Sequence, residues 1–358
     1  MSRTSPRGTT LPREERPLPA AHIVSTGTAL PGDAIDNEVM AKKLGISAEW
    51  IEMFIGTRKR HFAIDLETGK PTHTLADLGA QAGAQALARA GLEPEELDFV
   101  ILATATPDTL MPATVNLIAS RLCLNHVSTY QLQSGCAGAV QALDLARRLL
   151  DDQHRLGLVI GGDASVKHFV ADREMQGLPT SELVNYLLFG DGAGAVVVTA
   201  DAVPGAIVLR QVLNRFTGLG RAPGQVVRWF GAGDLARSQS EPDPPFEEDY
   251  KAIEEQVPQL AKEALDEILS STDWDRESTS YLLPPQLSGR MTSRITSDLA
   301  LGHATEISCV AETGNTGNAT PFFQLDLLYD RIRPGERAVA IAIESSKWIK
   351  GAFTVEGK

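Results

Sequence analysis

Short apolar runs alternate with amphipathic segments along most of this chain. The continuous apolar run at residues 99–103 is typical of a strand that is buried on both faces. In residues 137–150, Val140, Leu143 and Leu150 recur at spacings of three and seven, which predicts a helix with one apolar face. Strands that alternate with helices in this way predict an α/β fold with buried sheets.

The same pattern assigns most of the chain to elements. Strands are predicted at residues 21–26, 99–103, 128–132, 156–160, 193–198, 206–213, 280–283, 306–310, 338–343 and 352–355. Helices are predicted at residues 37–44, 48–54, 74–90, 113–122, 137–150, 246–269, 288–301 and 319–331. Gly91 is expected to cap the helix that precedes it, and Pro258 to kink or split the helix that contains it. Residues 221–245 contain several Gly and Pro and are predicted to form a loop.

The element order is similar in the two halves of the chain, which predicts an internal duplication with halves at residues 20–203 and 204–358. In each half a strand runs into a Gly-containing turn before a helix, at Gly135-Cys136 and at Gly314-Asn315. Ligands of open α/β sheets collect at such strand ends. Residues 1–19 are rich in Arg, Pro and Thr without an apolar core, which predicts a frayed tail and not a secretory signal.

Composition narrows the function classes. The 358 residues are 43% hydrophobic with a net charge of −13, which argues against nucleic acid as a partner. The basic run at residues 58–61 is either a local patch for an acidic partner or a solvated turn. No apolar run approaches the ~20 residues that cross a bilayer. Three cysteines form no disulfide framework and predict reduced thiols in the cytoplasm, and no metal site is predicted.

Cys136 is the strongest candidate for chemistry. A cysteine at a helix N-terminus faces unpaired N–H groups, which favours the thiolate. Gly135 and Gly138 allow a substrate close to the backbone, and the N–H of Cys136 could donate to an oxyanion. This arrangement suits acyl transfer through a thioester, while the alternative is a small buried hydrophobe. Cys123 and Cys309 lack this context and are interpreted as structural.

Several motifs, in order along residues 21–358, resemble β-ketoacyl-acyl-carrier-protein synthase III. They are Ser-Ala-Glu-Trp-Ile at 47–51, Gly-Thr-Arg-Lys-Arg at 56–60, residues 99–108 with Met-Pro-Ala at 111–113, Gln-Ser-Gly-Cys-Ala-Gly at 133–138, Phe-Gly-Asp-Gly-Ala-Gly at 189–194 and Gly-Asn-Thr-Gly at 314–317. The resemblance implies the thiolase fold: a dimeric, duplicated α/β unit in five α-β-α-β-α layers with a cysteine nucleophile. It implies no permanently bound cofactor, and thioesters of acyl-carrier-protein phosphopantetheine or coenzyme A as substrates.

The family uses a Cys-His-Asn triad, and this chain departs from it. Cys136 matches the cysteine and Asn315 the asparagine, but Pro285 stands where the histidine belongs. Ser288 replaces a second asparagine of that segment. In the glycine-rich loop that helps to form the family's oxyanion hole, Ser346 retains an N–H, although serine tolerates positive φ less well than glycine.

These substitutions favour one function over two others. One lost donor typically slows a reaction by about 100- to 1000-fold, so decarboxylative condensation of a malonyl thioester should be badly impaired. Loading an acyl group onto Cys136 demands less. The sequence therefore resembles family members of antibiotic and polyketide biosynthesis that act as acyltransferases, passing an acyl group to a thiol or hydroxyl. A decarboxylative synthase III that uses Asn315 and a water, and a non-catalytic partner subunit, stay open.

The resemblance also implies binding residues. Trp50 matches the tryptophan that stacks on the adenine of coenzyme A, with ordinary packing as the alternative. Arg58 and Arg173 match positions near the nucleotide, and Arg290 a position in the carrier-protein patch. Phe54 replaces a nucleotide-binding arginine, which favours a carrier protein as the donor.

Other residues are weaker candidates. Met111 matches the residue that shapes the partner subunit's acyl pocket across the dimer. Gln286, with Ser288, is expected to orient the acceptor. Of the residues that could replace the histidine, His303 is expected to be a helix C-cap and His168 borders the family's pantetheine tunnel. Glu312 is interpreted as a loop charge.

Overall fold

The computed structural model describes residues 20–168, 180–227 and 246–358. Ten strands form one sheet in the order β12-β11-β13-β14-β8-β1-β7-β6-β4-β5. In chain order they are β1 (Ala21–Ala29), β4 (Phe99–Thr104), β5 (Ser128–Gln133), β6 (Leu156–Asp163), β7 (Gly192–Thr199), β8 (Ile207–Phe216), β11 (Tyr281–Leu283), β12 (Thr305–Glu306), β13 (Arg337–Glu344) and β14 (Ile349–Glu356). The apolar run at 99–103 is β4, whose residues are all buried as predicted.

The sheet consists of two halves with the same topology. Read outward from the centre, one half runs β1-β7-β6-β4-β5 and the other β8-β14-β13-β11-β12. In each half the first strand lies innermost, followed by the fifth, fourth, second and third in chain order. The halves join where β1 pairs antiparallel with β8, with His22 opposite Val208. The predicted duplication is thus visible in the sheet, while the exact boundary at residue 203 stays a prediction.

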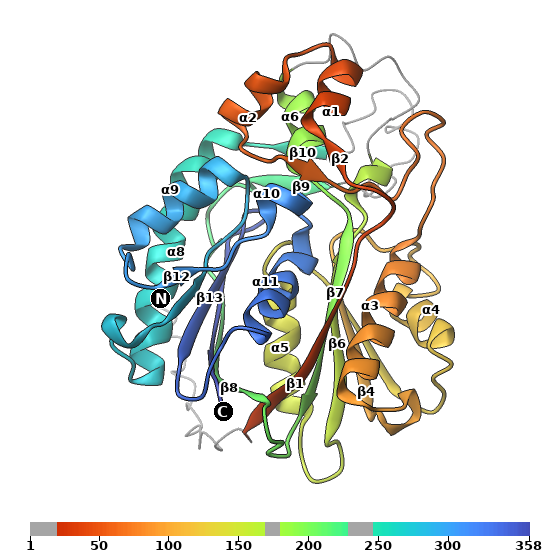
Figure 1. The fold of residues 1–358 in the computed structure, drawn as a ribbon, viewed down its shortest axis with the longest axis vertical. Helices are drawn as coiled ribbons and strands as arrows, with labels where there is room; N and C mark the ends of the chain where they lie inside the picture. The colour runs from red at the N-terminus through yellow and green to blue at the C-terminus, as the bar shows by residue number, and fades with distance from the viewer. Residues whose placement is uncertain (1–19, 169–179, 228–245) are drawn as a thin grey trace, which may run out of the picture.

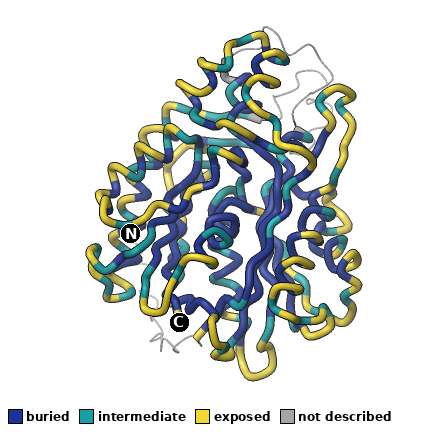
Figure 2. Tube along the Cα trace, in the orientation of Figure 1, coloured by how far each residue is buried: buried dark blue, intermediate teal, exposed yellow. Residues whose placement is uncertain are grey.

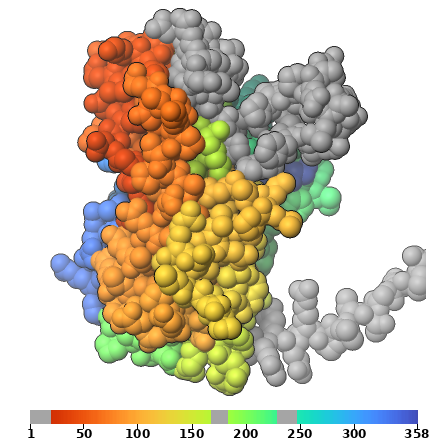
Figure 3. Space-filling view, turned by 90° about the vertical axis from the view of Figure 1, so that its right-hand side faces the viewer, coloured from red at the N-terminus to blue at the C-terminus, as the bar shows by residue number. Residues whose placement is uncertain are grey.

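Helices cover the sheet in layers (Figure 1). Helices α5 (Gly138–Leu149) and α11 (Thr320–Tyr329) lie between the two halves of the sheet. Helices α3 (Leu75–Ala90) and α4 (Thr114–Arg121) cover the outer face of the first half, which Figure 3 shows in orange and yellow. Helices α8 (Tyr250–Thr272) and α9 (Gly289–Leu299) cover the second half. The predicted five-layered α/β architecture is confirmed.

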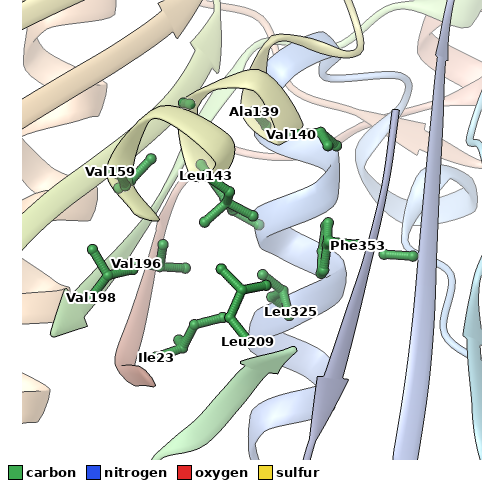
Figure 4. Close-up of a cluster of buried hydrophobic side chains, with 14 of the residues drawn as sticks. Ile23, Ala139, Val140, Leu143, Val159, Val196, Val198, Leu209, Leu325 and Phe353 are labelled. Carbon is green, nitrogen blue, oxygen red and sulfur yellow. The ribbon is translucent and has the colours of Figure 1, made fainter. Parts of the chain in front are cut away.

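The central layer holds a large apolar core. Leu143 of α5 and Leu325 of α11 pack with strand residues of both halves, including Ile23, Val196 and Phe353 (Figure 4). The strands and the two central helices are the most deeply buried part of the trace (Figure 2). This core fixes the N-terminal end of α5, and therefore the turn that carries Cys136.

A smaller group of elements caps one end of the sheet (Figure 1). It contains the helices α1 (Asn37–Leu44), α2 (Ala48–Phe54) and α6 (Thr180–Leu188). Two small sheets lie beside them: β2 (Ile35–Asp36) with β3 (Lys59–Arg60), and β9 (Gln225–Val227) with β10 (Phe246–Glu248). The bounds predicted for α1 and α2 are confirmed, since Asp36 and Ser47 cap their N-termini through side-chain hydrogen bonds.

Two predicted elements are wrong at their ends. The helix predicted from residue 246 begins at Tyr250, because Asp249 accepts a 3.0 Å hydrogen bond from the Ala252 N–H and caps it there. Pro258 does not split it, since α8 is one helix of 23 residues. The strand predicted to reach residue 310 ends at Glu306, and a short helix, α10 (Val310–Thr313), follows.

Other predictions fall partly or wholly on undescribed residues. The predicted tail at 1–19 and most of the predicted loop at 221–245 lie outside the described residues. In the described part of that loop, β9 is a strand. The basic run at 58–61 fits neither predicted alternative completely, because it is neither a wholly exposed patch for an acidic partner nor a wholly solvated turn. Arg58 and Lys59 pair with Glu312, while Arg60 is fully buried and its pKa is lowered to about 10 by desolvation. Within the described parts of the chain, no helix combines the length and apolarity that a membrane crossing requires.

Candidate active site

Cys136 lies in the turn between β5 and α5, as the sequence predicts. The turn is closed by a 2.8 Å hydrogen bond from the Gly138 N–H to the Gly135 carbonyl. A Cβ at Gly138 would lie 2.3 Å from Oδ1 of Asn318, so only glycine lets α5 approach this asparagine. The tight packing holds the nucleophile's turn against the second half of the fold, and the side chain of Cys136 remains half-buried.

Cys136 and Asn315 line the same two cavities. The larger cavity, of about 220 Å³, extends from Cys136 between the cap and helices α8 and α9. Its lining residues include Phe54, Leu188, Phe189, Glu248, Tyr250, Val257, Leu287, Ser288, Met291 and Ser345. The smaller cavity, of about 20 Å³, contains Pro285 and Gln286 in its wall. The structure therefore brings together the two residues that match the family's cysteine and asparagine.

Asn315 is held so that its amide can act as a donor. Its backbone bridges Phe189, and its Oδ1 accepts a 3.0 Å hydrogen bond from the Gly317 N–H. The amide Nδ2 forms no hydrogen bond within the described residues. The preceding Gly314 has a φ of 70°, and a Cβ there would lie 2.9 Å from the Gly190 nitrogen. The turn therefore needs glycine to place Asn315 at the cavity.

Pro285, which the sequence resemblance matches to the family's histidine position, has no side-chain donor or base. It lines the smaller cavity, and its carbonyl accepts a 3.2 Å hydrogen bond from the Thr292 hydroxyl. Ser288 lines the larger cavity and is the N-cap of α9, where its hydroxyl accepts a 3.1 Å hydrogen bond from the Met291 N–H. The substituted segment lies at the site, as predicted.

The polar atoms of Gln286 are occupied by the protein itself. Its Oε1 accepts hydrogen bonds of 2.8 Å from the N–H groups of both Cys309 and Val310, and its Nε2 donates to Ser308 at 2.9 Å. These contacts start helix α10, which explains why the predicted strand ends early. A role of Gln286 in orienting an acceptor stays a prediction.

The resting thiol of Cys136 is harder to ionise than the sequence suggests. Its pKa is raised to about 12, first by burial and then by the charges of Glu344, Asp163 and Glu248. A helix N-terminus typically contributes only about 0.3–1 kcal/mol in the opposite direction. The predicted preference for thiolate is therefore wrong, because desolvation and three carboxyl groups outweigh the helix dipole.

Glu344 joins the nucleophile's turn to the loop after β13. Its Oε2 accepts a 2.6 Å hydrogen bond from the Ser134 hydroxyl, and its Oε1 accepts one from the Ser346 hydroxyl. Ser345, rather than Ser346, lines the larger cavity. Trp348 is the residue of this loop with a left-handed φ, 64°, so the concern about positive φ at Ser346 does not arise.

Glu248 is a residue of the site that the sequence analysis missed. It ends strand β10 and lines the larger cavity with Cys136. Its Oε1 accepts a 2.5 Å hydrogen bond from Nε2 of Gln225. Burial raises the pKa of the Glu248 carboxyl to about 7 despite hydrogen bonds that lower it. No local sequence signal marks it, because β10 is defined by pairing with a distant strand.

None of the described residues predicted to bind the donor, Trp50, Arg58 and Arg290, is among the lining residues of the larger cavity. Trp50 packs against the ring of Phe54, with centroids 5.1 Å apart, and Phe54 lines the cavity. Arg58 donates a hydrogen bond to Glu312. The Glu312 carboxylate, predicted to be a loop charge, therefore forms an ion pair with Arg58. Arg290 donates to the Met53 carbonyl at 3.0 Å. Arg173 lies outside the described residues.

Met111 and the histidines complete the predicted set. The side chain of Met111 is 87% exposed, beside an exposed Leu110. Among the described side chains, no histidine lines a cavity that contains Cys136. His303 faces the Arg276 carbonyl, while Ala300 caps α9 with a φ of 53°, so the predicted cap is wrong. The side chain of His168 is outside the described set.

Comparison with known proteins finds relatives among the β-ketoacyl-acyl-carrier-protein synthases. The family model for 3-oxoacyl-(acyl-carrier-protein) synthase III matches residues 130–215. The β-ketoacyl-acyl-carrier-protein synthase III of Neisseria meningitidis serogroup A is 28% identical over 309 residues, which cover 86% of this chain and 89% of the relative.

Solved structures extend the match to almost the whole chain. AbyA1, a tetronic acid condensing enzyme, has a TM-score of 0.90 and 49% identity, over 94% of this chain and 100% of that one. The synthase III of Pseudomonas aeruginosa PAO1 has a TM-score of 0.79 and 26% identity, over 94% and 98%. The priming β-ketosynthase of the R1128 polyketide pathway, at 23% identity, shares the fold with a TM-score of 0.79 over 96% and 98%. The chain belongs to the β-ketoacyl-acyl-carrier-protein synthase III family of the thiolase superfamily.

Proposed function

We propose that this protein is an acyltransferase of the synthase III type, which acts in polyketide or antibiotic biosynthesis. It takes an acyl group from a thioester onto Cys136 and passes it to a thiol or hydroxyl acceptor. One observation carries the proposal: Cys136 and Asn315 meet at one cavity, whose wall holds Pro285 where the family has histidine. The nucleophile is kept and the decarboxylation machinery is incomplete.

The two half-reactions are the loading of Cys136 and the transfer to the acceptor, and neither of them releases carbon dioxide. The Cys136 sulfur bonds to the acyl carbon as the bond from that carbon to the donor sulfur breaks, and the thiol proton ends on the donor sulfur. The acceptor's oxygen or sulfur then bonds to the acyl carbon. The bond to Cys136 breaks, and the acceptor's proton returns to the Cys136 sulfur. The N–H groups of Cys136 and Ser346 are the proposed donors for charge on the acyl oxygen.

Decarboxylative condensation makes a demand that this site meets less well. The enolate left by a malonyl thioester needs donors at its oxygen, and Asn315 supplies one side-chain donor there. Removal of one preorganised donor typically costs about 100- to 1000-fold in rate. Pro285 cannot replace it, since proline has no side-chain donor.

A carrier-protein thioester is the proposed donor, and the protein is proposed to work as a homodimer in the cytoplasm. Phe54, which lines the larger cavity, is apolar, and Arg58 is already paired with Glu312. Both features weaken the case for binding the nucleotide of coenzyme A. The dimer proposal rests on the exposed Met111 and on β5, which is an end strand of the sheet in the described part of the chain.

The 49% identity with a tetronic acid condensing enzyme favours a second candidate. A tetronic acid is a five-membered lactone with an enolised ketone, so its assembly needs one ester bond and one C–C bond. Transfer from Cys136 to an acceptor's hydroxyl supplies the ester. If the acyl group is a 3-oxoacyl group, its acidic carbon then attacks the acceptor's own thioester and expels that thiol. Neither step releases carbon dioxide.

Intact-protein mass spectrometry tests these proposals. Wild type and Cys136→Ala are incubated with a panel of acyl-carrier proteins and acyl-coenzyme A thioesters. The acyltransferase predicts an acyl adduct on wild type that Cys136→Ala lacks, and product formation without a malonyl donor. Carbon dioxide release that depends on malonyl-carrier protein would instead identify a condensing synthase. If no thioester forms an adduct, the remaining hypothesis is that the protein is a non-catalytic partner subunit.

The second candidate has its own readout. A 3-oxoacyl donor and a hydroxyacyl-thioester acceptor are supplied together, and the small-molecule product is weighed. A ring product has lost both thiols, whereas simple acyl transfer leaves the acceptor's thioester intact. Absence of the double loss rejects ring formation without affecting the acyltransferase proposal.

A further inference from the structure

The cavity wall beside Cys136 contains a carboxyl group that the family triad does not include. We propose that Glu248 is the proton carrier of this site, taking the thiol proton of Cys136 and delivering it to the departing thiol, in place of the absent histidine. This inference rests on the proposed acyl transfer. Glu248 would touch the reacting groups through the cavity that it shares with Cys136 and Asn315.

Backbone hydrogen bonds hold Glu248 at the site. In the β9–β10 hairpin, Glu248 pairs with Gln225. The N–H of Asp249 donates to the Gly224 carbonyl at 2.8 Å, and the N–H of Gly224 donates to the Ser345 carbonyl at 3.0 Å. The hairpin is thus tied to the loop that lines the other side of the cavity. The position of Glu248 is therefore set by strand pairing and by these backbone hydrogen bonds.

The carboxyl group is prepared to exchange a proton. Its Oε1 is engaged by Gln225, while its Oε2 is buried without a well-formed hydrogen bond in the described part of the chain. An interaction with the Tyr250 side chain lowers the carboxyl pKa, as does the contact with Gln225. Burial nevertheless raises that pKa to about 7. A group that titrates near the working pH is the most effective general acid and base.

The other carboxyl groups near Cys136 already form hydrogen bonds or ion pairs with other residues. Both oxygens of Glu344 accept hydroxyl hydrogen bonds. Asp163 accepts hydrogen bonds from the backbone and side chains of residues 104–106 and Asn318. Glu254 also lines the larger cavity, but it is 64% exposed and pairs with Arg294. Glu248 combines burial with access to the cavity, and its Oε2 has no well-formed hydrogen bond among the described residues.

Proton transfer between the two groups relieves a repulsion. The Glu248 carboxylate raises the pKa of Cys136, so a thiolate beside that carboxylate is disfavoured. When the proton moves from sulfur to Glu248, the carboxylate charge is neutralised as the thiolate charge appears. The neutral carboxylic acid then donates the same proton to the departing donor sulfur. In the second half-reaction it accepts the proton of the acceptor and returns it to Cys136.

The test is the rate of acyl-Cys136 formation as a function of pH, followed by rapid quench and mass spectrometry. Wild type is compared with Glu248→Gln, Glu248→Asp and Glu247→Gln. Gln keeps the size of the side chain and an oxygen for the contact with Gln225. Glu247 is the matched control, since it is the neighbour on β10 and successive strand residues face opposite sides.

In wild type the rate should rise with pH through about 7, because the base must be ionised. In Glu248→Gln, acyl-Cys136 should form about 100-fold more slowly or slower still, and its rate should no longer rise with pH through about 7. In Glu248→Asp, the rate should still rise with pH, at values between those of wild type and Glu248→Gln. Glu247→Gln should have the rate and the pH dependence of wild type. Such rescue by a shorter carboxylate separates a proton carrier from a residue that only packs.

The outcomes distinguish this inference from the proposed function. If wild type forms no acyl-Cys136 with any donor, the acyltransferase proposal itself fails. If wild type is acylated and Glu248→Gln is acylated at the same rate with the same pH profile, only the role of Glu248 is overturned. An equal loss in Glu248→Gln and Glu248→Asp, with no rise of the rate with pH in wild type, also overturns it.

Discussion

The hydroxyl of Ser134 donates a 2.6 Å hydrogen bond to Oε2 of Glu344, and this contact joins the two halves of the fold beside Cys136. Ser134 precedes the nucleophile in the first half, whereas Glu344 ends β13 in the second. A Cβ at Gly135 would lie 3.1 Å from the Glu344 carboxyl carbon, so the turn packs closely against this group. The contact positions the nucleophile and places a negative charge near its sulfur.

Replacement of Glu344 by Gln should make Cys136 more reactive towards alkylation. The Glu344 charge is the second contributor, after burial, to the raised pKa of Cys136. Its removal lowers that pKa, and one unit gives about tenfold more thiolate below the pKa. The measurement is the iodoacetamide rate at pH 8, followed on the Cys136 peptide because Cys123 is also exposed.

Glu312→Gln is the control for this variant, since Glu312 is an exposed carboxyl paired with Arg58. Its alkylation rate should equal that of wild type. Equal rates in Glu344→Gln and wild type would show that the Glu344 charge does not act on the thiol.

Pro285→His should restore part of the decarboxylative chemistry. Pro285 lines the smaller cavity together with Cys136 and Asn315, so an imidazole there could supply a second donor. Carbon dioxide release from malonyl-carrier protein should rise by about tenfold or more over Pro285→Ala. Pro285→Ala controls for the loss of the proline ring. Equal release in the two variants would mean that the histidine position alone does not limit decarboxylation.

Gln286→Leu should lower stability because it leaves two backbone N–H groups without their acceptor. A buried group that loses its partner costs about 1–3 kcal/mol, so the free energy of unfolding should fall by about 2 kcal/mol or more. Denaturant unfolding measures the change, with Gln259→Leu on the exposed face of α8 as control. An unchanged stability with a raised KM for the acceptor would favour the predicted role in acceptor orientation.

Glu248→Gln should be more stable than wild type at pH 8 but not at pH 5. The folded-state pKa of Glu248 is raised to about 7, above its unfolded value, so the folded state favours the protonated form. Its contribution to stability is present at low pH and is lost as pH rises through about 7. The gain at pH 8 should be on the order of 1–2 kcal/mol after allowance for partial exposure. Equal pH dependence of unfolding in both proteins would contradict the raised pKa.

Local signals in the sequence predict the fold well where caps and apolar runs decide it. Helix α1 begins after Asp36 and ends at Gly45, whose φ is 69°, and both signals are readable from the chain. Helix α3 similarly lies between Thr74 and Gly91. Cys136, Asn315 and the substituted Pro285 could also be identified, because each lies within a short motif.

What the sequence does not predict depends on contacts between distant segments. Strand β10 forms because it pairs with β9, whereas the sequence pattern alone predicts that the following helix spans these residues. The raised pKa of Cys136 depends on Glu344 and Glu248, which come from the other half of the chain. Neither residue belongs to a motif, so their charge at the site becomes evident only when the halves are packed together.

The two equivalent turns of the duplicated fold have taken different tasks. The turn before α5 carries the nucleophile Cys136, and the turn before α11 carries the amide donor Asn315. In a symmetric pair of identical chains both turns would carry the same residue, so a nucleophile would face a second nucleophile. Because both turns lie in one chain, each can carry a different residue. The candidate site is therefore asymmetric, and one half can be substituted further while the other keeps the cysteine.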